Sequence, residues 1–317
     1  MSSLFRKVLL ALACLSGVVG VQAGDGPTRL AAGEWPVSRA EYVGADQCKS
    51  CHQVIKAHYA HTKHALAFER NPGDDLEARN CEACHGPGSA HVENPVAVNA
   101  IVDFGQDSDL PKDAVNGQCL QCHDEGERTH WANSIHDAND LMCSDCHNPM
   151  ARFSRKGLQR FDSVNETCMS CHKTQKVEFA KRSHMPLLEG KLACVDCHNP
   201  HGSATDPLLK ADSVNQVCYT CHQEKRGPFV FEHAPVRENC ANCHKPHGSN
   251  HESLLKTARP FLCQSCHAHS RHISDLLPVE AGPGGEFSDA RIAGRSCQNC
   301  HAQIHGSNHP AGVRMHR

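Results

Sequence analysis

The segment Cys194-Val195-Asp196-Cys197-His198-Asn199-Pro200-His201-Gly202-Ser203 decides the fold. Two cysteines three positions apart are followed at once by a histidine, and a second histidine comes three residues later. The Cys-x-x-Cys-His unit occurs ten times in 317 residues, and of the 21 cysteines only Cys14 lies outside it. The motif cysteines are Cys48, Cys51, Cys81, Cys84, Cys119, Cys122, Cys143, Cys146, Cys168, Cys171, Cys194, Cys197, Cys218, Cys221, Cys240, Cys243, Cys263, Cys266, Cys297 and Cys300.

Cys-x-x-Cys-His is the attachment motif for c-type haem. Two thiols at this spacing lie on one side of a helical turn and add to the two vinyl groups of one porphyrin, and the next residue then binds the iron. Disulfides and zinc sites also use cysteine pairs, but neither needs a histidine after every second cysteine. We therefore predict ten c-type haems (haem c, iron). The predicted proximal iron ligands are His52, His85, His123, His147, His172, His198, His222, His244, His267 and His301.

The remaining composition is poor material for a conventional core. Only 39% of residues are hydrophobic, a share that already includes the 21 cysteines, and 5% are aromatic. We expect the porphyrins to replace the apolar core. The predicted fold is a haem-cored multihaem c-type cytochrome of short α-helices and loops with little or no β-structure. The net charge of -3 excludes a nucleic-acid binder driven by a large basic surface.

The motifs alternate between two types. Asp162-Ser163-Val164-Asn165 precedes Cys168 just as Asp212-Ser213-Val214-Asn215 precedes Cys218, and CVDCHNPHGS at Cys194 resembles CANCHKPHGS at Cys240. Each module thus has a first motif and a second motif, and we predict an elongated array of five dihaem modules. Modules one to five span about 40–106, 107–157, 158–207, 208–256 and 257–317 of the decahaem domain 24–317.

Sixteen histidines lie outside the motifs, which is enough to give every iron a second, distal ligand. One lies between the two motifs of each module, and another follows the second motif in four modules. The predicted distal ligands are His64, His91, His136, His184, His201, His233, His247, His272 and His305. His61 is an alternative to His64, and His269 is an alternative to His272. The surplus candidates are His58, His61, His251, His269, His309 and His316.

Module two departs from this pattern. It reads His147-Asn148-Pro149-Met150 where module three reads His198-Asn199-Pro200-His201, so Met150 stands in a ligand position. A haem with His/Met ligation has a higher reduction potential. The alternatives are that His130 is the tenth distal ligand while Met150 packs on a porphyrin, or that one iron has an open position.

The N-terminus predicts export. Arg6 and Lys7 precede an apolar run from Val8 to Val21, which ends in Val21-Gln22-Ala23. This arrangement is typical of a secretory signal peptide, which we place at residues 1–23 and which includes Cys14. The alternative is a retained anchor, but the run is shorter than the roughly 20 residues that a membrane span needs.

Ligation separates the function classes. If every iron has two protein ligands, the chain is an electron carrier in which haems pass electrons to one another, not an enzyme, and we expect no catalytic residue. The alternative is a multihaem reductase with one open catalytic haem. A third class is a storage protein that holds electrons.

Several segments carry a resemblance to a known family. They are Cys194–Ser203, Glu224–Pro228, Glu232–Val236, and Gly294–Cys297 with His305–Pro310. With the ten motifs, they resemble the MtrA/DmsE family of periplasmic decahaem cytochromes, over nearly all of the chain after residue 23. In that family the position of Met150 usually holds histidine.

The resemblance implies a bis-His haem chain docked inside an outer-membrane β-barrel porin. It implies electron exchange between the periplasm and the cell exterior, as in extracellular iron respiration or iron oxidation. The implied partners are the porin, a periplasmic or inner-membrane cytochrome and an outer-surface multihaem cytochrome, with no nucleic acid. The implied location is periplasmic and associated with the outer membrane. It also suggests two pentahaem halves, at about 40–176 and 177–317.

Overall fold

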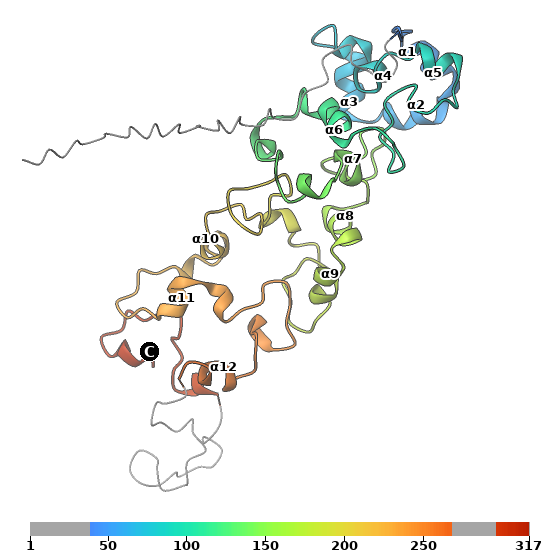
Figure 1. Cartoon of the computed structure of the whole chain (residues 1–317). Coiled ribbons are helices and arrows are strands. Elements are labelled where there is room, and N and C mark those ends of the chain that lie inside the picture. Colours follow the sequence, from blue (N-terminus) through green and yellow to red (C-terminus); the bar gives the residue numbers. More distant parts are fainter. Residues whose placement is uncertain (1–38, 268–295, 317) are drawn as a thin grey trace, which may run out of the picture.

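The computed structural model describes residues 39–267 and 296–316. In this part the chain is elongated, with α1 to α5 at one end and α12 near the other (Figure 1). The α-helices are α1 Ala45–Cys51, α2 Gln53–Tyr59, α3 Lys63–Ala65, α4 Cys81–His85, α5 Ser89–Glu93, α6 Lys112–Leu120, α7 Cys143–Cys146, α8 Val164–Cys171, α9 Lys173–Phe179, α10 Val214–Tyr219, α11 Ala234–Glu238 and α12 Phe261–Gln264. The signal peptide predicted at 1–23 and the predicted ligand His272 lie outside the described residues.

Short turns complete the secondary structure. One π-helical turn, η1, spans Leu66–Arg70. The 3-10 turns are η2 Glu77–Arg79, η3 Gly126–Arg128, η4 Asp137–Asn139, η5 Cys194–Asp196, η6 Gln223–Lys225, η7 Cys240–Asn242, η8 Glu252–Leu254, η10 Cys297–Asn299 and η11 Gly312–Arg314. Within the described residues β-structure is limited to isolated bridges, such as His198–Leu209 and His244–Leu255. The predicted fold of short helices and loops with little β-structure is confirmed.

The two motif types adopt different local structures. First motifs lie at the C-terminal ends of helices such as α6, α8 and α10. The side chains of Ser163 and Ser213 accept hydrogen bonds from the amides of Glu166 and Gln216, and so cap the N-termini of α8 and α10. Second motifs occupy single turns, namely α4, α7, η5, η7 and η10, and are followed by a loop.

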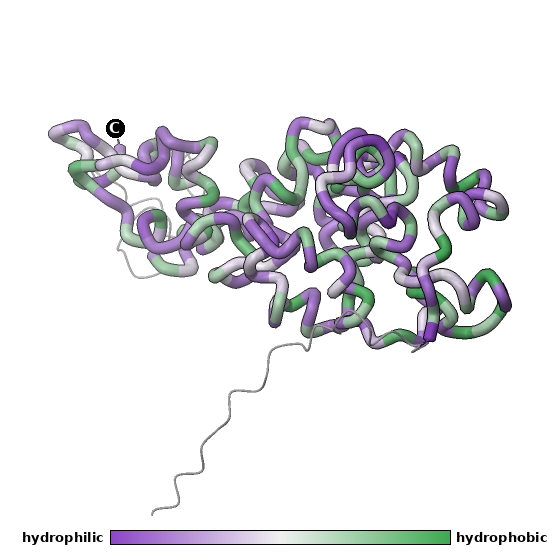
Figure 2. Tube along the Cα trace, turned by 90° about the horizontal axis from the view of Figure 1, so that it is seen from above, coloured by the Kyte–Doolittle hydropathy of each residue, from purple (hydrophilic) through white to green (hydrophobic). Residues whose placement is uncertain are grey.

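The apolar core is small. Within the described residues, one cluster of buried hydrophobic side chains contains Met169, Phe179 and Leu187, with the partly buried Met185, Leu192 and Cys194 packed against it. Hydrophobic positions are scattered along the tube and form no continuous layer (Figure 2). None of the described helices is long and apolar enough to cross a membrane. The polypeptide therefore encloses little apolar volume of its own.

Three loops that follow second motifs dock each module onto the one before it. We call them the trailing loops; they span residues 199–203, 245–249 and 302–307. Gly202 and Gly248 have φ angles of +114° and +155°. A Cβ at Gly202 would overlap the carbonyl oxygen of His130, and one at Gly248 would overlap that of Glu178. Glycine is therefore required where backbone packs on backbone.

Candidate haem-binding sites

Each motif closes one turn of backbone. The histidine amide donates to the carbonyl of the first cysteine, four residues earlier, over 2.8–3.0 Å. This bond is formed by His52, His123, His147, His172, His198, His222, His244, His267 and His301. Both cysteines and the histidine are thereby held on one short turn. All twenty motif cysteines have free thiols in the structure, so none of the pairs is committed to a disulfide.

Most motif histidines face a second histidine across a constant gap. In seven pairs the ring centroids are 5.9–6.2 Å apart. The pairs are His52–His91, His123–His64, His147–His201, His172–His136, His198–His247, His244–His305 and His267–His233. In every one, a predicted proximal ligand faces a predicted distal ligand.

This spacing fits one iron between two imidazoles. A nitrogen–metal distance of about 2 Å on each side places the ring centroids roughly 6 Å apart. The gap recurs at seven places along the chain, with three interplanar angles of 14–18° and others up to 72°. The seven pairs therefore share the distance between the two imidazoles but not the angle between them. This is expected if one iron between the rings fixes their distance and leaves each ring free to rotate.

Backbone carbonyls orient the proximal histidines of the second motifs. In these five residues Nδ1–H donates to a carbonyl, which leaves Nε2 available for the metal. The bonds are His85 to Val102 at 2.8 Å, His147 to Gly157 at 2.8 Å, His198 to Pro207 at 2.9 Å, His244 to Ser253 at 2.7 Å and His301 to Arg314 at 2.6 Å. The accepting loop thus fixes both the tautomer and the ring orientation.

Trailing loops also hold distal histidines. The Nδ1–H of His136 donates to the carbonyl of Pro200 at 2.7 Å, and that of His233 donates to the carbonyl of Ile304 at 2.9 Å. Each carbonyl belongs to the residue just before a distal histidine of the trailing loop, His201 or His305. One loop therefore supplies a histidine to one site and orients the histidine of the next site.

The environment of the paired rings favours neutral imidazole, the form that binds metals. Burial lowers the pKa of His64, His201 and His247, and a facing histidine lowers it further. Burial also lowers the pKa of His85. His184 is the contrast, because its hydrogen bond with Glu189 raises its pKa.

Some predicted ligands are placed differently. His184 Nε2 lies 3.0 Å from Glu189 Oε1 and has no close ring contact with His222 among the described interactions. His85 packs edge-on against Phe104 at 5.1 Å. His316, a surplus candidate, lies 4.4 Å from the ring of His301, which is too close for an iron between the rings.

The cysteines show how the motifs follow one another. Within each module the thiols of the two first cysteines lie close enough to interact. Between modules, the second cysteine of the later motif is near enough to raise the pKa of the second cysteine of the earlier motif. The pairs are Cys48–Cys81, Cys84–Cys122, Cys119–Cys143, Cys146–Cys171, Cys168–Cys194, Cys197–Cys221, Cys218–Cys240, Cys243–Cys266 and Cys263–Cys297. These contacts link all ten motifs in sequence order without a gap.

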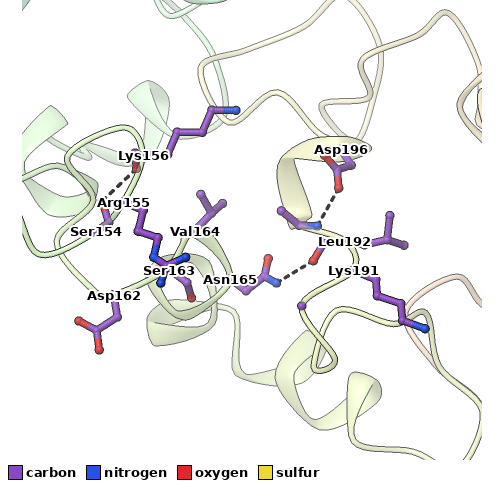
Figure 3. Close-up of a pocket in the computed structure, with 12 residues that line it drawn as sticks. Ser154, Arg155, Lys156, Asp162, Ser163, Val164, Asn165, Lys191, Leu192 and Asp196 are labelled. Carbon is purple, nitrogen blue, oxygen red and sulfur yellow. Dashed lines mark hydrogen bonds between the residues drawn. The ribbon is translucent and has the colours of Figure 1, made fainter.

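An asparagine three residues before the first motif joins the two motifs of modules two, three and four. Asn165 Oδ1 accepts from the amide of Cys194 at 2.9 Å, and its Nδ2 donates to Leu192 at 3.0 Å (Figure 3). Asn116 and Asn215 hold the amides of Cys143 and Cys240 in the same way. This role of the asparagine was not predicted from the sequence, where the repeated Val-Asn before the first motif is its only signal.

Comparisons with known proteins agree with this architecture. Residues 136–177, 184–227 and 233–272 match the family described as "Doubled CXXCH motif", and residues 81–155 match "Cytochrome c-type protein NrfB-like". The chain is 42% identical over 278 residues to the protein named "Multiheme cytochrome MtrA" of Shewanella baltica (strain OS185), covering 86% of this chain and 81% of that protein. Each doubled-motif match begins at a histidine that lies between two motifs and spans two neighbouring modules.

Proposed function

This chain belongs to the MtrA family of multihaem cytochromes, and it is therefore a c-type haem protein that transfers electrons. We propose that it carries ten haems, which form one continuous path for electrons. We further propose that this path conducts electrons between the periplasm and the cell exterior through an outer-membrane β-barrel porin. The process served is extracellular iron respiration or iron oxidation, depending on the potentials of the proteins at the two ends.

The observation that carries the proposal is the unbroken series of cysteine contacts. The thiols of Cys119 and Cys143 interact within module two, and Cys146 lies near Cys171 of module three. Because both cysteines of a motif bind one porphyrin, neighbouring porphyrins are attached at adjoining points. An electron can then pass from each haem to the next in sequence order.

The protein's own contribution is to hold and orient iron ligands. Haem supplies the redox chemistry when it is bound. Carbonyls such as those of Gly157 and Pro200 fix His147 and His136, and hydrogen bonds of this kind raise the basicity of an iron ligand. Ligand identity, burial and hydrogen bonding then set each potential.

The shape and surface favour a barrel as partner. The described chain is extended (Figure 1), and hydrophilic residues occur all along the tube, with no continuous hydrophobic layer (Figure 2). Direct contact with lipid would be costly for such a surface, whereas the lumen of a barrel is polar. A periplasmic or inner-membrane cytochrome would exchange electrons at one end, and an outer-surface cytochrome or a soluble iron species at the other.

The test has two parts. First, the haem-to-protein ratio of the purified chain is measured, with ten expected. Second, the chain and its porin are reconstituted in liposomes that hold a reduced dye, and a ferric chelate is added outside. We expect oxidation of the enclosed dye only when both proteins are present. Dye oxidation with the porin alone, or none with the pair, would overturn the proposal.

A further inference from the structure

Module two has Met150 where the later modules have a distal histidine, and this difference concerns the second haem site of module one. In the later modules, the distal histidine of a trailing loop always faces the second motif of the preceding module. His201 faces His147, His247 faces His198, and His305 faces His244. By this rule, the equivalent loop of module two, which contains Met150, would supply a ligand to the iron at His85. His147 already has its partner in His201.

His85 is otherwise prepared as an iron ligand. It is partly buried, and its Nδ1–H donates to the carbonyl of Val102 as in the other second motifs. Yet its described ring contact is with Phe104, not with a histidine. No histidine is described across from His85, so the distal ligand of the iron carried by Cys81, Cys84 and His85 is still to be assigned.

Met150 occupies the position from which the later loops supply histidine. Its amide donates to Asn148 Oδ1 at 3.0 Å, and the amide of His201 donates to Asn199 Oδ1 at 3.2 Å. The same local turn thus presents Met150 in one loop and His201 in the other. A methionine thioether is an established axial ligand of haem iron.

Module two also packs against this site. Gln121 Nε2 donates to the carbonyl of Ala83 at 3.5 Å, inside the second motif of module one. Gln106, four residues after the Val102 that holds His85, donates to Asp145 Oδ1 at 3.3 Å. The loop of Met150 follows Asp145 closely, so it belongs to the part of module two that borders His85.

His130 fits this role poorly. It is exposed, and its carbonyl is the group on which Gly202 of module three packs. It therefore lies where modules two and three meet. The loop of module two has Ala151 in place of the glycine, and Ala151 is buried. Its docking differs from that of the other loops.

We propose that Met150 is the distal ligand of the iron bound at Cys81, Cys84 and His85, which makes this haem the highest in potential of the array. The inference rests on the haem attachment proposed above. The position near one end of the path would make this haem a point where electrons collect before they leave or continue.

The test uses magnetic circular dichroism and EPR on the purified, oxidised holoprotein. We expect one methionine-to-iron charge-transfer band in the wild type. Met150→Leu should abolish the band and convert one iron to high spin. Met150→His should abolish it while all irons stay low-spin, and should lower the highest potential of the protein. Met185→Leu, a methionine of module three, should retain the band.

A second variant locates the ligand. In His201→Ala, the iron at Cys143 loses its partner, so we expect a new high-spin iron with the methionine band unchanged. If no new high-spin iron forms and the band persists, Met150 serves the iron at Cys143 and the inference is wrong. His61→Ala, in module one, should change nothing.

Two outcomes overturn the inference while leaving the proposed function intact. Ten low-spin haems without a methionine band would mean that a histidine such as His61 or His130 holds the iron. Ten haems with one high-spin iron that is unaffected by Met150→Leu would mean an open position. A haem count far below ten would instead contradict the proposed function.

Discussion

The imidazoles of His147 and His201 face each other with centroids 6.1 Å apart, although they belong to different modules. The residue before His201, Pro200, accepts the hydrogen bond of His136, which faces His172. One short loop of module three thus supplies a histidine to the haem site at Cys143 and orients a histidine of the haem site at Cys168. Docking of a loop and formation of the haem sites are therefore parts of the same event.

Replacement of Gly248 tests this coupling. In Gly248→Ala the added methyl would overlap the carbonyl of Glu178, so we expect the loop to withdraw and stability to fall by about 3 kcal/mol. His247 would withdraw from His198, and one low-spin iron would become high-spin. EPR and thermal unfolding followed by Soret absorption measure the two effects.

Gly117 provides the matched control, since it lies in α6 with nothing near the position of its Cβ. Gly117→Ala should stabilise by up to about 1 kcal/mol and leave the spin state unchanged. If the two alanine variants behave alike, the trailing loop does not position His247.

The asparagine clamp predicts a second destabilising change. Asn215 is buried; it accepts from the amide of Cys240 at 2.6 Å and donates to the carbonyls of Val236 and Arg237. Asn215→Ala leaves these groups without partners, at about 1–3 kcal/mol for each buried group. We expect a clear loss in thermal stability of the holoprotein. Asn242→Ala, which removes one exposed hydrogen bond to Pro235, should cost below about 0.5 kcal/mol.

The sequence was informative where chemistry requires neighbouring residues. A porphyrin needs two thiols and a histidine within one turn, so the motif alone predicts covalent sites and proximal ligands. Distal ligands come from elsewhere in the chain. The sequence supplied good candidates, such as His247 and His305, but could not assign each to an iron, because the partner lies in the neighbouring module.

Other features depend on packing and had only weak signals. The need for glycine at Gly202 becomes clear only when the carbonyl of His130 is seen beside it. The sequence marks Met150 as unusual but does not say which iron it could bind. That assignment needs the observation that a trailing loop supplies its histidine to the second motif of the preceding module, and only the histidine ring pairs in the structure show this. His91 shows the limit of that rule, since it faces His52 within its own module.

His184 yields a prediction from its place in the repeat. His136 and His233 lie at the equivalent position and face the first-motif histidines of the next modules, His172 and His267. We expect His184 to bind the iron at His222 and to leave Glu189 when it does. His184→Ala should therefore create one high-spin iron in the EPR spectrum, and Glu189→Ala none. A fully low-spin His184→Ala protein would assign this iron to another ligand.

The extended arrangement predicts a large radius of gyration. A compact chain of this length would have a radius of gyration of about 19 Å. The extended chain in Figure 1 must have a larger radius of gyration if it is to conduct electrons across a membrane. Small-angle X-ray scattering of the holoprotein, with monomer mass checked by light scattering, measures it directly. A monomer near 19 Å would contradict an elongated array.

The small apolar core predicts that folding depends on haem. Ordering each residue costs about 1–2 kcal/mol of backbone entropy, while the main buried cluster of Met169, Phe179 and Leu187 is too small to offset this over so long a chain. To produce the chain without haem, residues 1–23 are replaced by a single Met so that it stays in the cytoplasm. We expect this haem-free chain to have the far-UV circular dichroism spectrum of an unfolded protein and no cooperative melt. The haem-loaded protein serves as the control and should melt cooperatively. A haem-free chain with native-like helix content and a sharp transition would show that the polypeptide, and not the porphyrins, supplies the core.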